Sequence, residues 1–85
     1  MNHYVVMPTA EAAAEWGEFF GAPSTGLTAN GFRAHCRGER IYFSAGATDF
    51  MRSWYPDDDG SVTEDEDGQL MMWLDGRPYA VHCEP

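Results

Sequence analysis

The sequence has no lysine, only two cysteines and no apolar run close to the roughly 20 residues of a membrane span. Its start shows no basic segment followed by a long apolar stretch, so no secretory signal is predicted. We therefore expect a cytoplasmic protein in which Cys36 and Cys83 stay reduced rather than paired. The chain has five arginines and 14 acidic residues, which give a formal net charge of -9 at pH 7. That charge argues against direct binding of nucleic acid or of a membrane, and for a basic partner.

The chain is nevertheless rich enough in apolar residues to fold. Hydrophobic residues make up 44% of its 85 residues and aromatic residues 14%. A chain of this length has room for one hydrophobic core, so residues 1–85 are predicted to form a single globular domain.

The first third of the sequence predicts a strand followed by a helix. A β-rich run covers 3–7 and ends at Pro8. Thr9 can cap a helix over 10–20, which Gly21 and Pro23 would stop. Helical spacing places one apolar face opposite one acidic face. The apolar face holds Ala13, Trp16 and Phe20, and the acidic face holds Glu11, Glu15 and Glu18.

The middle of the sequence predicts a hairpin and a short helix. Alternation over 32–37 and again over 40–44 indicates two strands joined by a type II′ turn at Gly38-Glu39. Thr48 can cap a helix over 49–54, whose buried side would hold Phe50, Met51 and Trp54.

The last third predicts an acidic loop and a second hairpin. Residues 57–68 carry seven acids in the eleven positions up to Asp67 and are predicted to be a loop. Asp75-Gly76 between two β-rich runs is typical of a type I′ turn. Pro78 places the last strand at a sheet edge or delays its start. The order β-α-β-β-α-β-β predicts a two-layer α+β fold, with the main helix packed on an antiparallel sheet of four to five strands.

The acidic segment is the main candidate for a binding surface. Extended at about 3.3 Å per residue, it would place a carboxylate roughly every 5 Å, close to the spacing of phosphates along a nucleic-acid strand. Such a surface would fit a groove lined by lysine and arginine, and neighbouring aromatic residues could anchor the contact. The predicted partner-binding residues are Asp57, Asp58, Asp59, Glu64, Asp65, Glu66, Asp67, Glu11, Glu15, Glu18, Trp54 and Tyr55.

The same residues also permit a calcium-binding interpretation. With Gly60 at the sixth position of an EF-hand-type loop, the third, fifth and twelfth positions are acidic, but Tyr55 replaces the first carboxylate. The pairs His35-Cys36 and His82-Cys83 resemble zinc ligands, yet neighbours on a strand point to opposite faces. We therefore predict no metal and no other cofactor.

A basic and aromatic patch is predicted on the first hairpin, from Arg33, His35, Arg37, Arg40 and Tyr42. It is superficially similar to sheets that bind single-stranded nucleic acid. Because the net charge opposes that ligand, the patch is better explained as a protein contact. No catalytic motif, such as a nucleophile elbow or a phosphate-binding glycine loop, is present, so no enzymatic activity is predicted.

In its brevity, its acidic helix stripe and its DDDGSVTEDED segment, the chain resembles the small acidic proteins with which phages and other mobile elements block bacterial defence, including anti-CRISPR and anti-restriction proteins. The resemblance implies a non-enzymatic inhibitor that occludes the nucleic-acid site of a type I CRISPR surveillance complex. The alternatives are an immunity or adaptor protein that binds a toxin or enzyme through the arginine-rich hairpin, and a calcium-binding domain. Exposed strand edges could also pair two copies into a homodimer.

Overall fold

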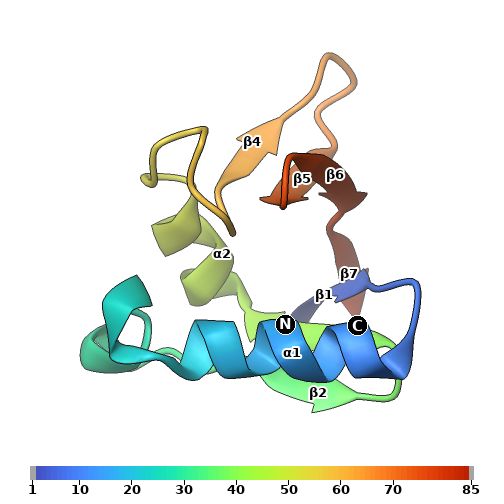
Figure 1. Cartoon of the computed structure of the whole chain (residues 1–85). Coiled ribbons are helices and arrows are strands. Elements are labelled where there is room, and N and C mark those ends of the chain that lie inside the picture. Colours follow the sequence, from blue (N-terminus) through green and yellow to red (C-terminus); the bar gives the residue numbers. More distant parts are fainter. Residues whose placement is uncertain (1, 85) are drawn as a thin grey trace.

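The computed structural model describes residues 2–84 and has an α+β fold with two antiparallel sheets (Figure 1). The order of elements is β1 (Asn2–Val6), α1 (Ala10–Gly21), the short 3-10 turns η1 (Pro23–Thr25) and η2 (Thr28–Asn30), β2 (His35–Arg37), β3 (Arg40–Ser44), α2 (Ala45–Met51), β4 (Val62–Glu64), β5 (Leu70–Leu74), β6 (Arg77–Ala80) and β7 (His82–Glu84). The predicted fold class is confirmed. The strands are more numerous than expected and form two sheets instead of one.

The first sheet has the order β2-β3-β1-β7, so the first and last strands lie side by side. Residues paired in register share a face, so Val5, Ile41 and Cys36 lie on one side of this sheet. Val5 and Ile41 are completely buried there, whereas Val6, next along β1, is 42% exposed. We call the buried side the inner face and the opposite side the outer face. The turn at Gly38 has a positive φ of 58°, as the predicted type II′ geometry requires.

Helix α1 packs on the inner face as its sequence predicts. The Thr9 hydroxyl accepts a hydrogen bond from the Ala12 amide at 3.0 Å and so caps the helix. Ala13 and Phe20 are buried and Trp16 is half-buried. The helix approaches β2 so closely that a Cβ at Gly17 would collide with the Cys36 sulfur. A larger residue at position 17 would therefore push the helix off the sheet.

Helix α2 begins four residues earlier than predicted and follows β3 without a loop. Ser44, not Thr48, caps it, and the Ser44 hydroxyl accepts a hydrogen bond from the Ala47 amide at 3.1 Å. Thr48 lies inside the helix, fully buried, with its hydroxyl 2.6 Å from Nδ1 of His3 on the inner face. The prediction was wrong because this buried polar contact spans 45 residues of sequence. As a result, Trp54 lies beyond the helix.

The second sheet, of order β4-β5-β6, contains the predicted hairpin. Asp75 and Gly76 both have positive φ, at 54° and 74°, which confirms the type I′ turn. Pro78 is on β6, an edge strand of this sheet, where its missing N–H does not interrupt the hydrogen bonds between strands. The predicted loop at 57–68 is interrupted by strand β4, whose Val62 pairs with Met72. The acidic segment therefore consists of two turns on either side of a short strand and is not a continuous loop.

The last strand divides at Val81, and this division creates the second sheet. β6 pairs with β5, whereas β7 pairs with β1. The buried Val81 between them donates its amide to the Leu70 carbonyl at 2.9 Å. A single run of residues thus serves both sheets. The shared core lies between the two sheets and the helices, and its largest buried side chains include Phe20, Phe43, Met51 and Met72.

Candidate functional site

The acidic segment is bent into two separate groups of carboxylates. Between them, Gly60, Ser61 and Val62 are buried, and the Gly60 amide donates a hydrogen bond to the Trp73 carbonyl at 2.7 Å. The expected extended ribbon with a charge every few ångströms is therefore wrong. The charges project from two turns at opposite ends of β4. We call Asp57–Asp59 the acidic ridge and Asp65–Asp67 the acidic tip.

The acidic ridge is held in place by hydrogen bonds of its own turn. The Asp58 amide donates to the Tyr55 carbonyl at 2.9 Å. The Asp59 carboxylate accepts a hydrogen bond from the Asp75 amide at 2.8 Å, which ties the ridge to the β5-β6 turn. Asp57 and Asp58 are exposed. No sequence pattern indicated this role for Asp75, because only the folded chain brings its backbone amide to the ridge.

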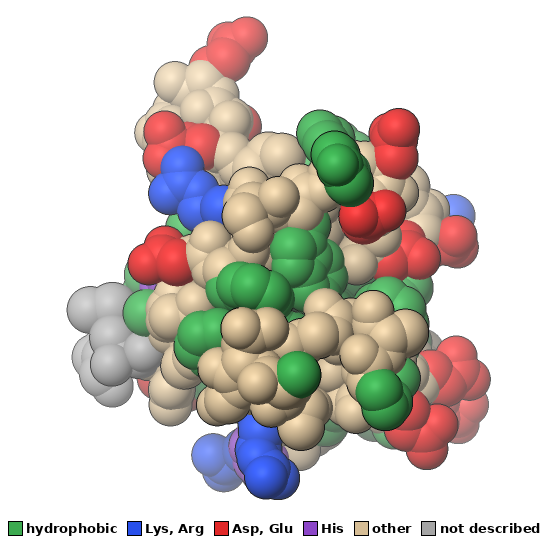
Figure 2. All heavy atoms as spheres, turned by 90° about the vertical axis from the view of Figure 1, so that its left-hand side faces the viewer, with side chains coloured by type: hydrophobic (Ala, Val, Ile, Leu, Met, Phe, Trp, Pro, Cys, Tyr) green, Lys and Arg blue, Asp and Glu red, His purple; other side chains and the backbone are tan. Residues whose placement is uncertain are grey.

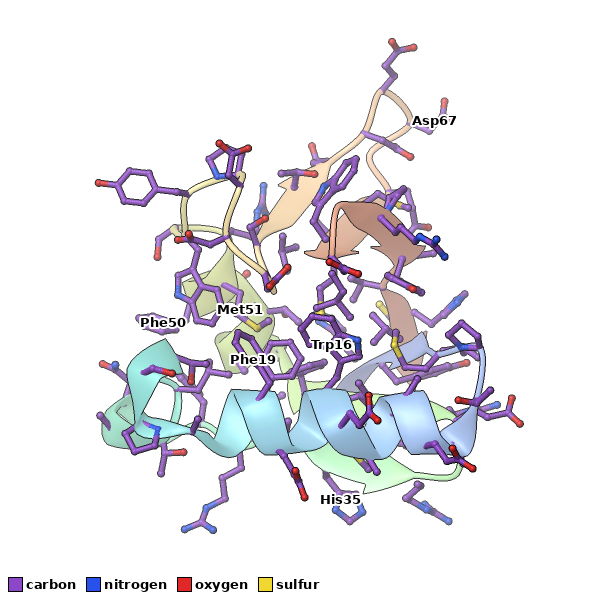
Figure 3. The ribbon with its side chains drawn as sticks, in the orientation of Figure 1. Trp16, Phe19, His35, Phe50, Met51 and Asp67 are labelled. Carbon is purple, nitrogen blue, oxygen red and sulfur yellow. The ribbon has the colours of Figure 1, made fainter. Side chains whose placement is uncertain are left out.

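A groove with aromatic walls runs along one side of the ridge. It is lined by Phe19, Ser24, Thr25, Ser53, Trp54, Tyr55, Asp58 and Asp59. Tyr55 is 79% exposed, and Trp54 is half-buried with its ring edge against Phe50 at a centroid distance of 6.0 Å. In Figure 3, the labelled Phe19, Phe50 and Met51 lie close to one another, and Phe19 also lines this groove. The structure thus places Trp54 and Tyr55 next to the ridge acids.

A second groove lies on the other side of the ridge. Its lining comprises Pro56, Asp57, Asp58, Asp59, Thr63, Trp73 and Gly76. The Trp73 indole donates a hydrogen bond to the Thr63 hydroxyl at 2.9 Å, which fixes the ring against β4. The ridge therefore stands between two depressions, each with a tryptophan in its wall. Trp73 was not among the residues predicted from the sequence, because a tryptophan in a predicted strand is first interpreted as a core residue.

The acidic tip lies at the end of the β4-β5 hairpin. The Asp65 carboxylate accepts hydrogen bonds from the amides of Asp67 and Gln69, both at 2.9 Å, and so shapes the turn. All three tip acids are exposed. Figure 3 shows Asp67 at the end of this hairpin, which points away from α1. Glu64, at the end of β4, lies 3.8 Å from the Arg52 guanidinium.

The helix acids form a third group, separate from the tip. Glu11, Glu15 and Glu18 are exposed, as predicted, on the side of α1 away from Ala13 and Phe20. Because α1 and the acidic tip lie on opposite sides of the molecule (Figure 3), the ten predicted acids do not form one patch. In Figure 2, acidic side chains accordingly lie in several groups around the rim of the face, with apolar side chains between them.

Few of these charges are neutralised within the chain. Among residues 2–84, the Arg52–Glu64 contact is the one ion pair within 4.0 Å, and both side chains are about half exposed. Exposed pairs of this kind contribute little to stability. The carboxylates of the ridge, the tip and α1 therefore project an uncompensated negative field into solvent.

Within residues 2–84, no three His, Cys, Asp or Glu side chains lie close enough together to hold a metal ion. The structure therefore supports neither the calcium nor the zinc interpretation in this part of the chain. The predicted calcium ligands fail because Asp59 and Glu66 are on opposite ends of β4. The two His-Cys pairs lie on β2 and β7, the two edge strands of the first sheet. Three strand spacings of about 4.8 Å separate those strands, too far for a zinc site or a disulfide. Both cysteines are free.

Comparisons with known proteins give this chain no relative: no protein-family model, curated protein or solved structure matches it. None of the helices within residues 2–84 has the length and apolar character needed to cross a membrane. Any function must therefore be inferred from the surface of the molecule itself.

Proposed function

We propose that the chain is a cytoplasmic, non-enzymatic inhibitor that binds the basic, nucleic-acid-binding groove of a bacterial defence complex. A type I CRISPR surveillance complex is the target that the proposal names. The observation that carries it is the acidic ridge flanked by two tryptophan-walled grooves. A groove built for DNA presents lysine and arginine, which pair with carboxylates, while tryptophan and tyrosine supply the desolvated contact area of an interface.

The three acidic groups have different roles in this proposal. The ridge makes the close contact, because its carboxylates lie beside Trp54, Tyr55 and Trp73. The tip and the α1 acids line neither groove, so they contribute through their field. They accelerate encounter with a basic partner, and this contribution falls as added salt shortens the Debye length to about 8 Å at physiological ionic strength.

The experiment measures how well the protein displaces duplex DNA from a purified type I CRISPR surveillance complex. The test variant is Asp57→Asn/Asp58→Asn, which removes two ridge charges and spares Asp59, the partner of the Asp75 amide. The matched control is Glu11→Gln/Glu15→Gln, which removes the same charge from α1. We expect displacement to weaken by about tenfold or more for the ridge variant and by less than about threefold for the control.

Two results would contradict the proposal. If the wild-type protein fails to displace DNA at any excess, the named complex is not the target. If the ridge variant and the control lose equal affinity, charge alone matters and the ridge is not the contact. Tyr55→Ala provides a second measurement at the same site. Because this ring is 79% exposed, its removal should leave the fold intact and still weaken displacement.

A further inference from the structure

The outer face of the first sheet carries a row of four rings, one from each strand. The register pairs His35 with Tyr42, Tyr42 with Tyr4, and Tyr4 with His82, so all four side chains lie on the same face. The ring centroids are 6.4, 5.4 and 5.0 Å apart in that order. We call these four residues the aromatic row. Only His35 and Tyr42 were recognised from the sequence, because β1 and β7 join the sheet through long-range pairing.

Arginines line the same face. Arg37 and Arg40 pair in register across the hairpin, on the same face as the aromatic row. The Arg40 guanidinium carbon lies 4.4 Å from the centroid of Tyr4, and Arg40 donates a hydrogen bond to the Tyr42 hydroxyl at 3.2 Å. This hydrogen bond raises the pKa of Arg40 further, so its charge is fixed. Arg33, which precedes β2, is exposed and lines a depression together with His35, Arg37 and Tyr42. Three of the five arginines thus gather here.

This face is open in the part of the chain that the structure describes. The α1 helix contacts the inner face through Gly17 and Cys36, and α2 contacts it through Thr48 and His3. On the outer face His35, Arg37, Arg40 and His82 are exposed. In Figure 2, arginine and histidine side chains project together below the body of the protein, away from most of the acidic groups. A shallow depression on this face is lined in part by Arg33, His35, Arg37 and Tyr42.

The acids near this face are few. Glu84 pairs in register with Asn2 and borders the depression, and Glu39 occupies the hairpin turn. Three arginines outnumber these two carboxylates. The net charge of -9 belongs to the whole chain, whereas a bound strand senses mainly the charges within about one Debye length, roughly 10 Å at 0.1 M salt. The net charge therefore weakens binding of an anion to this face without forbidding it.

We propose that the outer face of the four-stranded sheet binds a single strand of nucleic acid. The arginines contact phosphates. The two imidazoles at the ends of the aromatic row are exposed, so each can stack with an unpaired base. Tyr42 is buried and Tyr4 is half-buried, so the two tyrosines support the imidazoles rather than contact bases. An acidic protein segment would use the arginines but would leave the ring faces without a role. The row therefore favours a nucleic-acid strand.

The experiment measures fluorescence anisotropy of a labelled oligothymidine of about ten nucleotides in a salt series that starts at about 0.1 M, where the Debye length is roughly 10 Å. The test variant is Arg33→Ala/Arg37→Ala. The matched control is Arg52→Ala/Arg77→Ala, which removes the same two charges from elsewhere on the molecule. We expect about a tenfold or greater loss of affinity for the test variant, less than about threefold for the control, and a slope of log affinity against log salt that is shallower by about 1.4 in the test variant only.

A second variant, His35→Ala, tests the row separately from the arginines. This side chain is exposed, so its loss should not disturb the fold, which a thermal melt checks. Removing one stacking platform should weaken binding by about fivefold or more. Absence of binding at about 0.1 M salt, equal losses in the two arginine pairs, or equally tight binding of a polyglutamate peptide would each overturn the proposal. The last result would assign the face to an acidic protein.

Discussion

The two ends of this molecule differ in charge although they share one core. The side that carries the ridge and the tip presents six carboxylates, with Asp75 beside them and one nearby ion pair, Arg52–Glu64. The outer face of the first sheet instead gathers three of the five arginines around a row of rings. Composition fixes only the sum of these charges. Strand register and turn geometry decide where they lie, so a strongly acidic chain can still present a basic face.

The largest predicted effect tests whether both regions depend on the same core. Phe20 on α1 is completely buried, packs edge-on against Phe43 of the first sheet at 5.0 Å, and lies against Gly60 next to the ridge. Phe20→Ala should therefore lower the free energy of unfolding by about 3–5 kcal/mol. Urea denaturation followed by tryptophan fluorescence measures it.

The form of the unfolding curve is as informative as its midpoint. A single transition, coincident by fluorescence and by far-ultraviolet circular dichroism, is expected for one cooperative core. Two separated transitions in the Phe20→Ala protein would show that the two sheets are stabilised independently. The acidic region and the outer face would then belong to two separate subdomains and not to one cooperative domain.

The second prediction concerns the attachment of the ridge. Gly60 has a φ of +96°, and a Cβ there would lie 2.7 Å from a Phe20 ring carbon and 2.8 Å from a Trp54 ring carbon. Gly68, in the acidic tip hairpin, also has a positive φ, of +81°, but no atom lies within 4 Å of the position that a Cβ would take there. Gly68→Ala should cost about 1–2 kcal/mol from backbone strain alone, and Gly60→Ala should cost more because the clash adds to the strain.

Thermal melts of the two variants measure this difference. Equal losses of stability would mean that the ridge turn can shift without disturbing Phe20 and Trp54, and that the ridge is not fixed by the core. A larger loss at Gly60, together with weaker displacement of DNA, would tie the geometry of the ridge to its proposed binding role.

Local patterns were sufficient to predict several features of the fold. The Thr9 cap, the turns at Gly38-Glu39 and Asp75-Gly76 and the exposed acids of α1 depend on residues close in sequence, and each is confirmed. The ridge acids and their aromatic neighbours Trp54 and Tyr55 were also identified, although the charge spacing proposed for them was wrong. These features follow from local backbone preferences and from periodicity.

The features that the sequence did not predict depend on distant contacts. The break at Val81 follows from a hydrogen bond to Leu70 and from pairing of β7 with β1, neither of which leaves a local signal. Burial of Ser61 within an acidic run likewise depends on β5, where the Trp73 amide donates a hydrogen bond to the Ser61 carbonyl at 2.9 Å. The aromatic row could not be assembled from sequence, because Tyr4 and His82 are 78 residues apart in the chain and meet only through sheet order.

The third prediction separates binding from stability in the acidic region. Asp57 and Asp58 are exposed and lie in no ion pair within residues 2–84. Their replacement by asparagine should change the free energy of unfolding by no more than about 0.5 kcal/mol, as is usual for exposed positions. Chemical denaturation measures it. A marked gain in stability would show that the native ridge is strained by its own repulsion, which is a common cost at binding sites.

The last prediction is kinetic and compares one residue from each edge of the first sheet. Cys36 on β2 faces α1, and its sulfur donates a hydrogen bond to the Ala13 carbonyl at 3.1 Å, whereas Cys83 on β7 is exposed. Burial raises the pKa of the Cys36 thiol, outweighing an opposing hydrogen bond from the Gly17 backbone. Since the thiolate is the reactive form, Cys36 should be alkylated by iodoacetamide about tenfold or more slowly than Cys83 at pH 8.

Mass spectrometry of peptides after timed alkylation distinguishes the two sites. The direction of the pH dependence follows from the raised pKa of Cys36. Because folding raises the pKa of Cys36, the folded state favours the protonated thiol, so this residue's contribution to stability is complete at neutral pH and is lost as pH rises through the raised pKa. Alkylation of Cys36 should therefore accelerate steeply in alkaline solution, as α1 loosens from β2. Equal rates for the two cysteines at pH 8 would mean that α1 already opens readily. The close approach at Gly17 would then not hold the helix against the sheet.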